Sequence, residues 1–151
     1  MSSMEARLTL ITLGVDDLDR AIAFYRDVVG WTPASIVEGD VAFFDLDGLI
    51  LALWGHRDLA ADSGLPVDGL GAYQGFALAH NVGSRQEVDA LFARLDERGA
   101  TIAKWPVETD WGGYSGYMVD PDGHRWEIAH NPFWPLRSDG RIAFPSPDGE
   151  A

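Results

Sequence analysis

The sequence has 151 residues, of which 46% are hydrophobic and 23% are charged, a composition typical of a soluble globular domain. The absence of cysteine excludes disulfide frameworks, zinc ribbons and thiol catalysis, and the formal net charge of −13 argues against binding to nucleic acid or to an anionic membrane. No apolar run reaches the length of a membrane span and the start lacks the pattern of a signal peptide, so we expect a cytoplasmic protein. Its partner is then a small molecule or a second copy of the chain.

The first half of the chain predicts a strand, a helix and a hairpin. Arg7–Val15 alternates bulky and small residues, as a strand does. The segment "DDLDRAIAFYRDVVGW" predicts a helix with an aspartate at its N-cap and Gly30 just past its end. The inward stripe of that helix consists of Leu18, Ile22, Tyr25 and Val29. "VAFFDLDGLILALWG" predicts two strands around a two-residue turn at Asp47-Gly48.

The second half repeats this plan. Gly75–Val82 predicts a strand, and "SRQEVDALFARLDERGA" predicts a helix that opens with the capping box Ser84-x-x-Glu87 and ends at Gly99. The inward residues of that helix are Val88, Leu91, Phe92 and Leu95. The stretch "YMVDPDGHRWEIAHNP" then supplies a closing hairpin around an Asp-Pro-Asp-Gly turn.

The chain is therefore predicted to be one α+β domain built from two βαβββ modules. The predicted ranges are residues 7–57 for the first module, 58–73 for a connector, 74–132 for the second module and 136–151 for a polar tail. We expect the two modules to place their sheets side by side as a cup-shaped mixed sheet. The tail is predicted to be either mobile or a strap over the surface.

Two motifs carry a resemblance to a known family. "VDDLDRAIAFYRDVVGW" in the first module and "GYMVDPDGHRWEI" at the end of the second are similar to the glyoxalase/bleomycin-resistance/dioxygenase family, also called the vicinal oxygen chelate superfamily. The resemblance covers roughly Leu8–Asn131. It implies the two-module fold, but it leaves the reaction open, since the superfamily contains lyases, isomerases, dioxygenases, transferases and antibiotic-binding proteins without catalysis. Whether this chain is an enzyme is thus undecided at this point.

The resemblance also implies where a divalent metal would sit. The metal enzymes of that superfamily hold the ion with one ligand from each of four strands, and the ion polarises neighbouring oxygens of the substrate. The corresponding positions here are Leu10, Ala52, Phe76 and Glu127. Only Glu127 has a donor atom, so no cofactor is expected, with a divalent metal at a rearranged site as the alternative.

The histidines provide one test of that alternative. His124 and His130 each lie three residues from Glu127, and alternate residues of a strand point to opposite faces. Both are therefore predicted to point away from Glu127 and to be surface or rim residues, unless a bulge or a second subunit changes this. His80, at a strand end, could reach the rim of the cup.

Aromatic residues provide the other candidates for a site. The segment "TDWGGYSGY" presents Trp111 and Tyr114 on a glycine-rich loop, where aromatic side chains often contact ligand, although a structural turn is equally compatible. Trp54 lies at a strand end, whereas Trp31 and Trp126 are expected in the core. We predict a ligand pocket lined by Trp54, His80, Trp111, Tyr114 and Glu127.

Glu127 has three possible roles, because a carboxylate in an apolar strand needs a partner or a cavity. It is a relic of a metal site held by a tyrosine or tryptophan, a group that orients a polar or cationic ligand, or a general base with a raised pKa.

Two functions remain open from the sequence. The favoured one is a protein that binds a small organic molecule in an aromatic-lined cup without a metal. The alternative is a metal-dependent lyase, isomerase or dioxygenase of the same superfamily. In either case a homodimer is expected.

Overall fold

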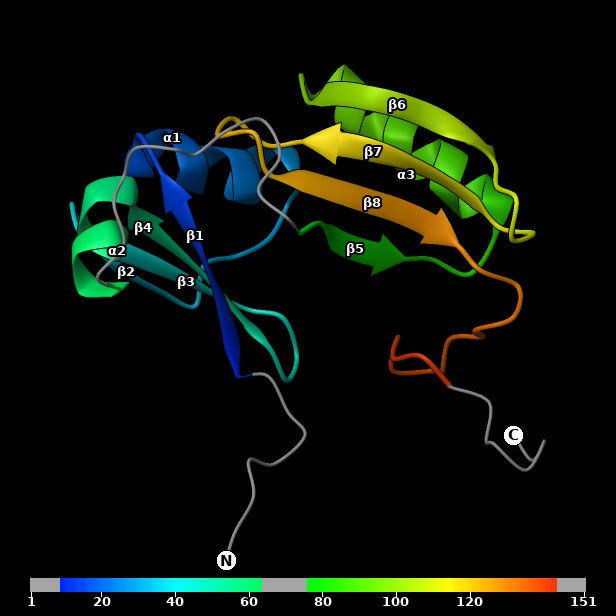
Figure 1. Cartoon of the computed structure of the whole chain (residues 1–151), viewed down its shortest axis with the longest axis horizontal. Helices are drawn as coiled ribbons and strands as arrows, with labels where there is room; N and C mark the ends of the chain where they lie inside the picture. Colours follow the sequence, from blue (N-terminus) through cyan, green and yellow to red (C-terminus); the bar gives the residue numbers. More distant parts are fainter. Residues whose placement is uncertain (1–8, 64–75, 144–151) are drawn as a thin grey trace, which may run out of the picture. The chain divides into compact units, whose positions relative to one another are not determined.

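The computed structural model describes residues 9–63 and 76–143, which belong to two compact units that meet in sequence between Gln74 and Gly75. Unit 1 contains the elements β1 (Leu10–Val15), α1 (Leu18–Ala23), the π-helix η1 (Phe24–Val28), β2 (Ser35–Val37), β3 (Val41–Asp45), β4 (Ile50–Gly55) and α2 (His56–Ser63). Unit 2 contains β5 (Leu78–Asn81), α3 (Arg85–Glu97), β6 (Thr101–Glu108), β7 (Tyr114–Val119) and β8 (Arg125–His130) (Figure 1).

Each unit is a four-stranded mixed sheet with the same topology. The strand order is β1-β4-β3-β2 in unit 1 and β5-β8-β7-β6 in unit 2. In both, the first strand pairs parallel with the last and the other pairs are antiparallel. The predicted α+β class and the duplicated module are therefore confirmed.

The first helix is capped as predicted but does not continue as an α-helix. Asp17 is the N-cap, and its side chain accepts a hydrogen bond from the Arg20 backbone N–H at 3.1 Å. The last turn is a π-helix, in which the Val29 N–H donates to the Phe24 carbonyl five residues back. In this wider turn Phe24 and Tyr25 are both buried, with their rings edge to face at 5.1 Å. Gly30 ends the helical segment with φ 93°, as its position predicted.

In both predicted hairpins, an aspartate side chain accepts a hydrogen bond from the backbone N–H of the residue two positions later. Asp45 accepts from the N–H of Asp47 at 3.0 Å, and Asp120 accepts from the N–H of Asp122 at 2.9 Å. The first turn needs two residues with positive φ, and Asp47 and Gly48 supply them with φ 60° and 106°. The turn positions predicted from the sequence are confirmed.

Helix α3 also follows its sequence signals. The Ser84 side chain accepts from the Glu87 N–H at 3.1 Å, while the Glu87 carboxylate accepts from the Gly83 N–H at 2.8 Å. Val88, Phe92 and Leu95 are buried and Leu91 is partly buried. The glycine after the helix, Gly99, has φ 91°.

Two segments contain structure that the sequence analysis did not assign. The predicted connector begins inside helix α2, which the polar sequence "HRDLAADS" did not reveal because it lacks a clear apolar stripe. In the predicted tail, residues 136–143 are ordered by an isolated antiparallel bridge between Leu136 and Ile142. The predicted strand start at Arg7, most of the connector and residues 144–151 lie outside the described residues. Among the described helices, none combines the length and apolar character that a membrane crossing requires.

Each sheet has a face covered by its own helix. In unit 1, α1 and η1 cover the face that buries Leu13, Val15, Ala42, Phe44, Leu51 and Leu53. The buried Tyr25 ring meets Phe44 at 6.0 Å and stacks on the half-buried Trp31 at 5.9 Å. In unit 2, α3 covers the face that buries Met118, Trp126 and Ile128, so the core position predicted for Trp126 is confirmed (Figure 1). The opposite faces carry the candidate residues Leu10, Ala52 and Trp54 in unit 1 and Glu127 in unit 2.

Candidate ligand-binding site

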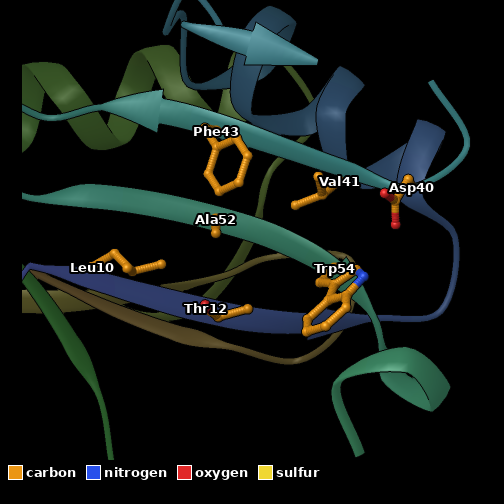
Figure 2. A pocket seen from close by; sticks show the side chains of 7 residues that line it. All are labelled: Leu10, Thr12, Asp40, Val41, Phe43, Ala52 and Trp54. Carbon is orange, nitrogen blue, oxygen red and sulfur yellow. The ribbon is translucent and has the colours of Figure 1, made fainter. Parts of the chain in front are cut away.

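Unit 1 contains a cavity of about 250 Å³ on the face of its sheet opposite α1. Its lining comes from strands β1, β3 and β4 and the residue that precedes β3 (Figure 2). The lining residues are Leu10, Thr12, Asp40, Val41, Phe43, Ala52 and Trp54. Alternation along the three strands explains all of these residues except Asp40, because each strand turns its other residues into the core beneath α1.

The strand register arranges the lining in rows. Thr12, Ala52 and Phe43 are direct neighbours across β1, β4 and β3. In the next row Trp54 lies between Gly14 and Val41. Asp40 precedes Val41 and is therefore at the same end of the cavity as Trp54, while Leu10 is at the other end (Figure 2). The cavity thus has an apolar end and an end with polar groups.

Trp54, predicted from the sequence as a pocket residue, lines this cavity together with Leu10 and Ala52, two of the metal positions implied by the resemblance. The indole Nε1 of Trp54 is buried and has no hydrogen-bond partner among the residues that the structure describes. The acidic residue at the rim, Asp40, was not identified from the sequence. Strand alternation gave no signal for it, because Asp40 precedes β3 and an extended pattern would place it on the side of Ala42 and Phe44.

Glu127 lies on the face of the unit 2 sheet opposite α3, in a row of paired residues that crosses all four strands. Lys104 pairs with Tyr117, Tyr117 pairs with Glu127, and Glu127 pairs with Ala79. Burial, and secondly the negative charge of Glu127, raise the pKa of the Tyr117 hydroxyl above its usual value. Tyr117 was missed in the sequence analysis, although counting outward from the Asp120–Gly123 turn pairs it with Glu127.

Two other predicted site residues of unit 2 do not share that face. Tyr114 lies directly opposite His130, on the face that α3 covers, and its hydroxyl donates to Asp89 of α3 at 2.6 Å. That hydrogen bond is the main cause that raises the pKa of Tyr114. His80 pairs with Ile128 on the same side; it is exposed to solvent on part of its surface, and desolvation by surrounding atoms lowers its pKa. Within unit 2 the structure therefore does not bring Tyr114 or His80 together with Glu127.

Trp111 lies at the tip of the β6–β7 loop. The Thr109 backbone and side chain hold this loop through three hydrogen bonds with Gly112 and Gly113. The Trp111 ring occupies the place where a Cβ on Gly113 would be, which makes that residue's glycine a structural requirement. The indole is still 46% exposed, so Trp111 is available to a partner.

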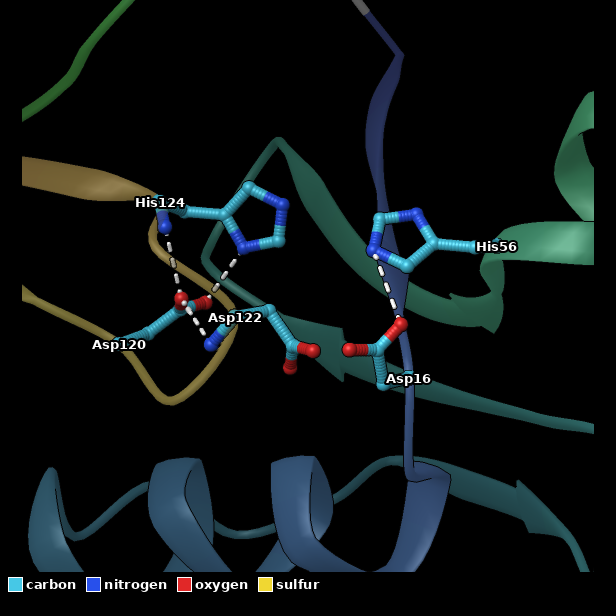
Figure 3. Close-up of polar contacts among 5 residues, drawn as sticks. All are labelled: Asp16, His56, Asp120, Asp122 and His124. Carbon is cyan, nitrogen blue, oxygen red and sulfur yellow. Dashed lines mark hydrogen bonds and ion pairs between the residues drawn. The ribbon is translucent and has the colours of Figure 1, made fainter. Parts of the chain in front are cut away.

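His124 is buried, which corrects the prediction that it is a surface or rim residue. It is 4% exposed, and its Nδ1 donates to the Asp120 carboxylate at 2.6 Å (Figure 3). Asp120 also accepts from the backbone N–H of His124 at 2.8 Å. His124 is part of the turn itself, because its ring and its backbone N–H both bind the Asp120 carboxylate that stabilises the hairpin. His130 is partly buried, with Nδ1 3.2 Å from the Val82 carbonyl.

Strand parity behaves as the sequence predicted. The register between β7 and β8 runs without a shift from Tyr114–His130 to Val119–Arg125. His130 consequently points to the face opposite Glu127, and His124 lies before the strand begins. Neither histidine of this hairpin joins Glu127.

In unit 1, His56 lies near the face of the sheet that carries the cavity. His56, the first residue of α2, has its Nε2 3.7 Å from the Asp16 carboxylate, as Figure 3 shows. A Cβ on Gly14 would lie 2.5 Å from the Nδ1 of His56, so the glycine provides the space for the imidazole.

The metal positions implied by the resemblance do not match what a divalent ion requires. Leu10 and Ala52 line the cavity, and their side chains contain only carbon and hydrogen. In β5 the residue opposite Glu127 is Ala79, so alternation puts Ala77, not Phe76, on the Glu127 side, and neither residue has a donor side chain. Divalent ions need several oxygen, nitrogen or sulfur ligands, and Glu127 alone supplies one.

Comparisons with known proteins agree with this architecture. A sequence model described as the Glyoxalase/Bleomycin resistance protein/Dioxygenase superfamily matches residues 7–128. Proteins named metallothiol transferase FosB are 35% identical over 123 residues in Shouchella clausii (78% of this chain, 75% of the relative) and 30% identical over 119 residues in Lysinibacillus sphaericus (78% and 77%). The crystal structure of a glyoxalase-related enzyme from Fulvimarina pelagi superposes with a TM-score of 0.82 at 36% identity, covering 94% of this chain and all of that one.

Proposed function

Because the chain belongs to the Glyoxalase/Bleomycin resistance protein/Dioxygenase superfamily, we propose that it binds a small organic molecule in the cavity of unit 1 without a divalent metal. The observation that carries the proposal is the lining of this cavity. Two of the positions where the superfamily's metal enzymes have ligands are Leu10 and Ala52, and they are joined there by the aromatic residues Phe43 and Trp54. Such a lining favours an apolar or aromatic part of a ligand through the hydrophobic effect.

Glu127 in this proposal acts as a charged group on the sheet face opposite α3 in unit 2, not as part of a metal centre. Its partner across the strands is Tyr117, so the two side chains leave neighbouring positions on the same face of the sheet. This pair orients polar groups by hydrogen bonding. No reaction step is assigned to it.

The test is ligand binding in the presence of a chelator. Candidate organic molecules are screened by the shift of the melting temperature, because a ligand that binds only the folded state raises it. Ala52→Leu fills the cavity from its wall and is expected to abolish the shift. Ala93→Leu, the same change on the exposed surface of α3, is the matched control and is expected to leave it unchanged. Binding that is equal in both variants would place the ligand elsewhere.

A metal-dependent activity is the second candidate, and the similarity to proteins named metallothiol transferase is the observation that favours it. Elemental analysis of the purified protein separates the two. A stoichiometric divalent metal that disappears in Glu127→Gln would overturn the metal-free proposal. Less than stoichiometric metal in the purified protein agrees with it, whereas stoichiometric metal that persists in Glu127→Gln would place a metal site elsewhere and would also overturn the metal-free proposal.

The homodimer and the cytoplasmic location stay predictions of the sequence. Light scattering during size-exclusion chromatography measures the first of these directly.

A further inference from the structure

We propose that the ligand of the unit 1 cavity is a small organic cation, an amine or ammonium group attached to a compact apolar body. This inference rests on the proposed function, since it names the class of molecule that the same cavity accepts. It follows from the charge, the aromatic content and the size of the lining.

The charge that the cavity lining carries is negative. Asp40 is its acidic member, and the other six residues that line the cavity carry no charge. The carboxylate of Asp40 is exposed at the rim and, within residues 9–63 and 76–143, it forms no ion pair with a lysine, arginine or histidine. A carboxylate in this position attracts a cation, repels an anion and offers a neutral ligand only a hydrogen-bond acceptor.

The aromatic residues strengthen the same preference. Trp54 and Phe43 both belong to the lining, and tryptophan is the best of the aromatic side chains at attracting a cation to the face of its ring. Figure 2 shows Trp54 and Asp40 at the same end of the cavity, so a positive group that enters between them meets a carboxylate and an indole together.

The rest of the cavity suits the remainder of such a molecule. Leu10, Ala52 and Phe43 provide an apolar wall away from Asp40, and the Thr12 hydroxyl adds a hydrogen-bond acceptor for an N–H group. A volume of about 250 Å³ is small compared with those of most ligand pockets. The cavity therefore suits a molecule with a single ring and one short charged substituent.

The experiment compares three probes of nearly equal size that differ in charge: benzylamine, benzyl alcohol and benzoate. Binding to the full-length protein is measured by calorimetric titration at neutral pH and low salt, with chelator present. We expect benzylamine to bind roughly tenfold more tightly than benzyl alcohol, and benzoate not to bind. Added salt is expected to weaken only the binding of benzylamine.

Two variants locate the origin of this preference. Asp40→Asn keeps the shape of the side chain and removes its charge, and it is expected to bring benzylamine within about twofold of benzyl alcohol. Glu38→Gln removes one charge from the same turn at an exposed residue that does not line the cavity, and the tenfold preference is expected to persist. Preference lost equally in both variants would assign it to the net charge of the protein and overturn the inference.

The outcomes separate this inference from the proposed function. Equal binding of all three probes, abolished by Ala52→Leu, would overturn the cation preference while leaving the cavity as a binding site. Binding of none of them would overturn the inference. If Ala52→Leu changes the affinity for no organic molecule in the thermal screen, the proposed function itself fails.

Discussion

Tyr117 and Glu127 are directly paired across β7 and β8, so a phenol and a carboxylate extend from neighbouring positions on the sheet face opposite α3. Both side chains are partly exposed. The relationship explains how a glutamate is accommodated within a strand that otherwise buries Trp126, Ile128 and Ala129. It also makes the ionisation of Tyr117 depend on the charge of Glu127.

The first prediction concerns the pKa of Tyr117, which burial and then the charge of Glu127 hold above the usual value of 10.0. Glu127→Gln removes only the second cause, so the pKa is expected to fall part of the way toward that value. Titration of the Tyr117 ring signals by NMR measures the change. Glu97→Gln, an equal loss of charge on the exposed side of α3, is expected to have no effect.

The raised pKa of Tyr117 makes the free energy of unfolding depend on pH in the alkaline range. A group whose pKa is raised by folding favours its protonated form in the native state, so its contribution is complete below pH 10 and is lost as the pH rises through the folded pKa. Tyr117→Phe cannot ionise and is expected to lose less stability than the wild type between neutral pH and pH values above 10. Chemical denaturation at the two pH values provides the comparison, and parallel losses would contradict the prediction.

The second hairpin turn is expected to be far more sensitive than the first. Asp120 is buried and accepts three hydrogen bonds, two from backbone N–H groups and one from His124, whereas the exposed Asp45 accepts one from Asp47. Asp120→Ala leaves buried donors without a partner and is predicted to cost about 3 kcal/mol of unfolding free energy. Asp45→Ala is predicted to cost about 1 kcal/mol. Urea denaturation of both variants tests the difference, and equal losses would show that burial is not its cause.

Gly116 is predicted to tolerate no side chain. A Cβ at this position would lie 2.5 Å from the Lys104 carbonyl, 2.9 Å from the Pro106 nitrogen and 2.8 Å from the Phe92 ring. Since two of these neighbours are backbone atoms of β6, Gly116→Ala is expected to lose about 3 kcal/mol of stability. At Gly83 the nearest atom is the flexible Glu87 carboxylate at 3.4 Å, and Gly83→Ala is expected to change stability by about 0.5 kcal/mol. Thermal denaturation distinguishes the two.

Fluorescence can show which tryptophan meets the ligand. Trp54 lines the unit 1 cavity, whereas Trp111 lies on a loop of unit 2 over Gly113. We expect the change in tryptophan fluorescence on binding benzylamine to disappear in Trp54→Phe and to persist in Trp111→Phe. A response that depends on Trp111 instead would support the sequence-based assignment of that loop to the ligand pocket.

Local signals in the sequence predicted much of the fold. The caps at Asp17 and Ser84 and the turns at Asp47-Gly48 and Asp120–Gly123 formed as expected, because each depends on hydrogen bonds or φ values within a few residues. The π-helical turn of Phe24–Val28 and the polar helix α2 were not predicted. Both depend on packing against the rest of unit 1, which periodicity alone does not report.

The sequence by itself determined the superfamily, the duplicated module and the lack of donor atoms at Leu10 and Ala52, since these depend on residue identity and short-range order. The tertiary structure decided which side chains share a surface. It placed Tyr117 beside Glu127, turned Tyr114 toward Asp89, buried His124 against Asp120 and brought Asp40 to the same cavity as Trp54. Strand register and helix packing set these neighbours, because a shift of one residue in pairing moves every side chain of a strand to the other face.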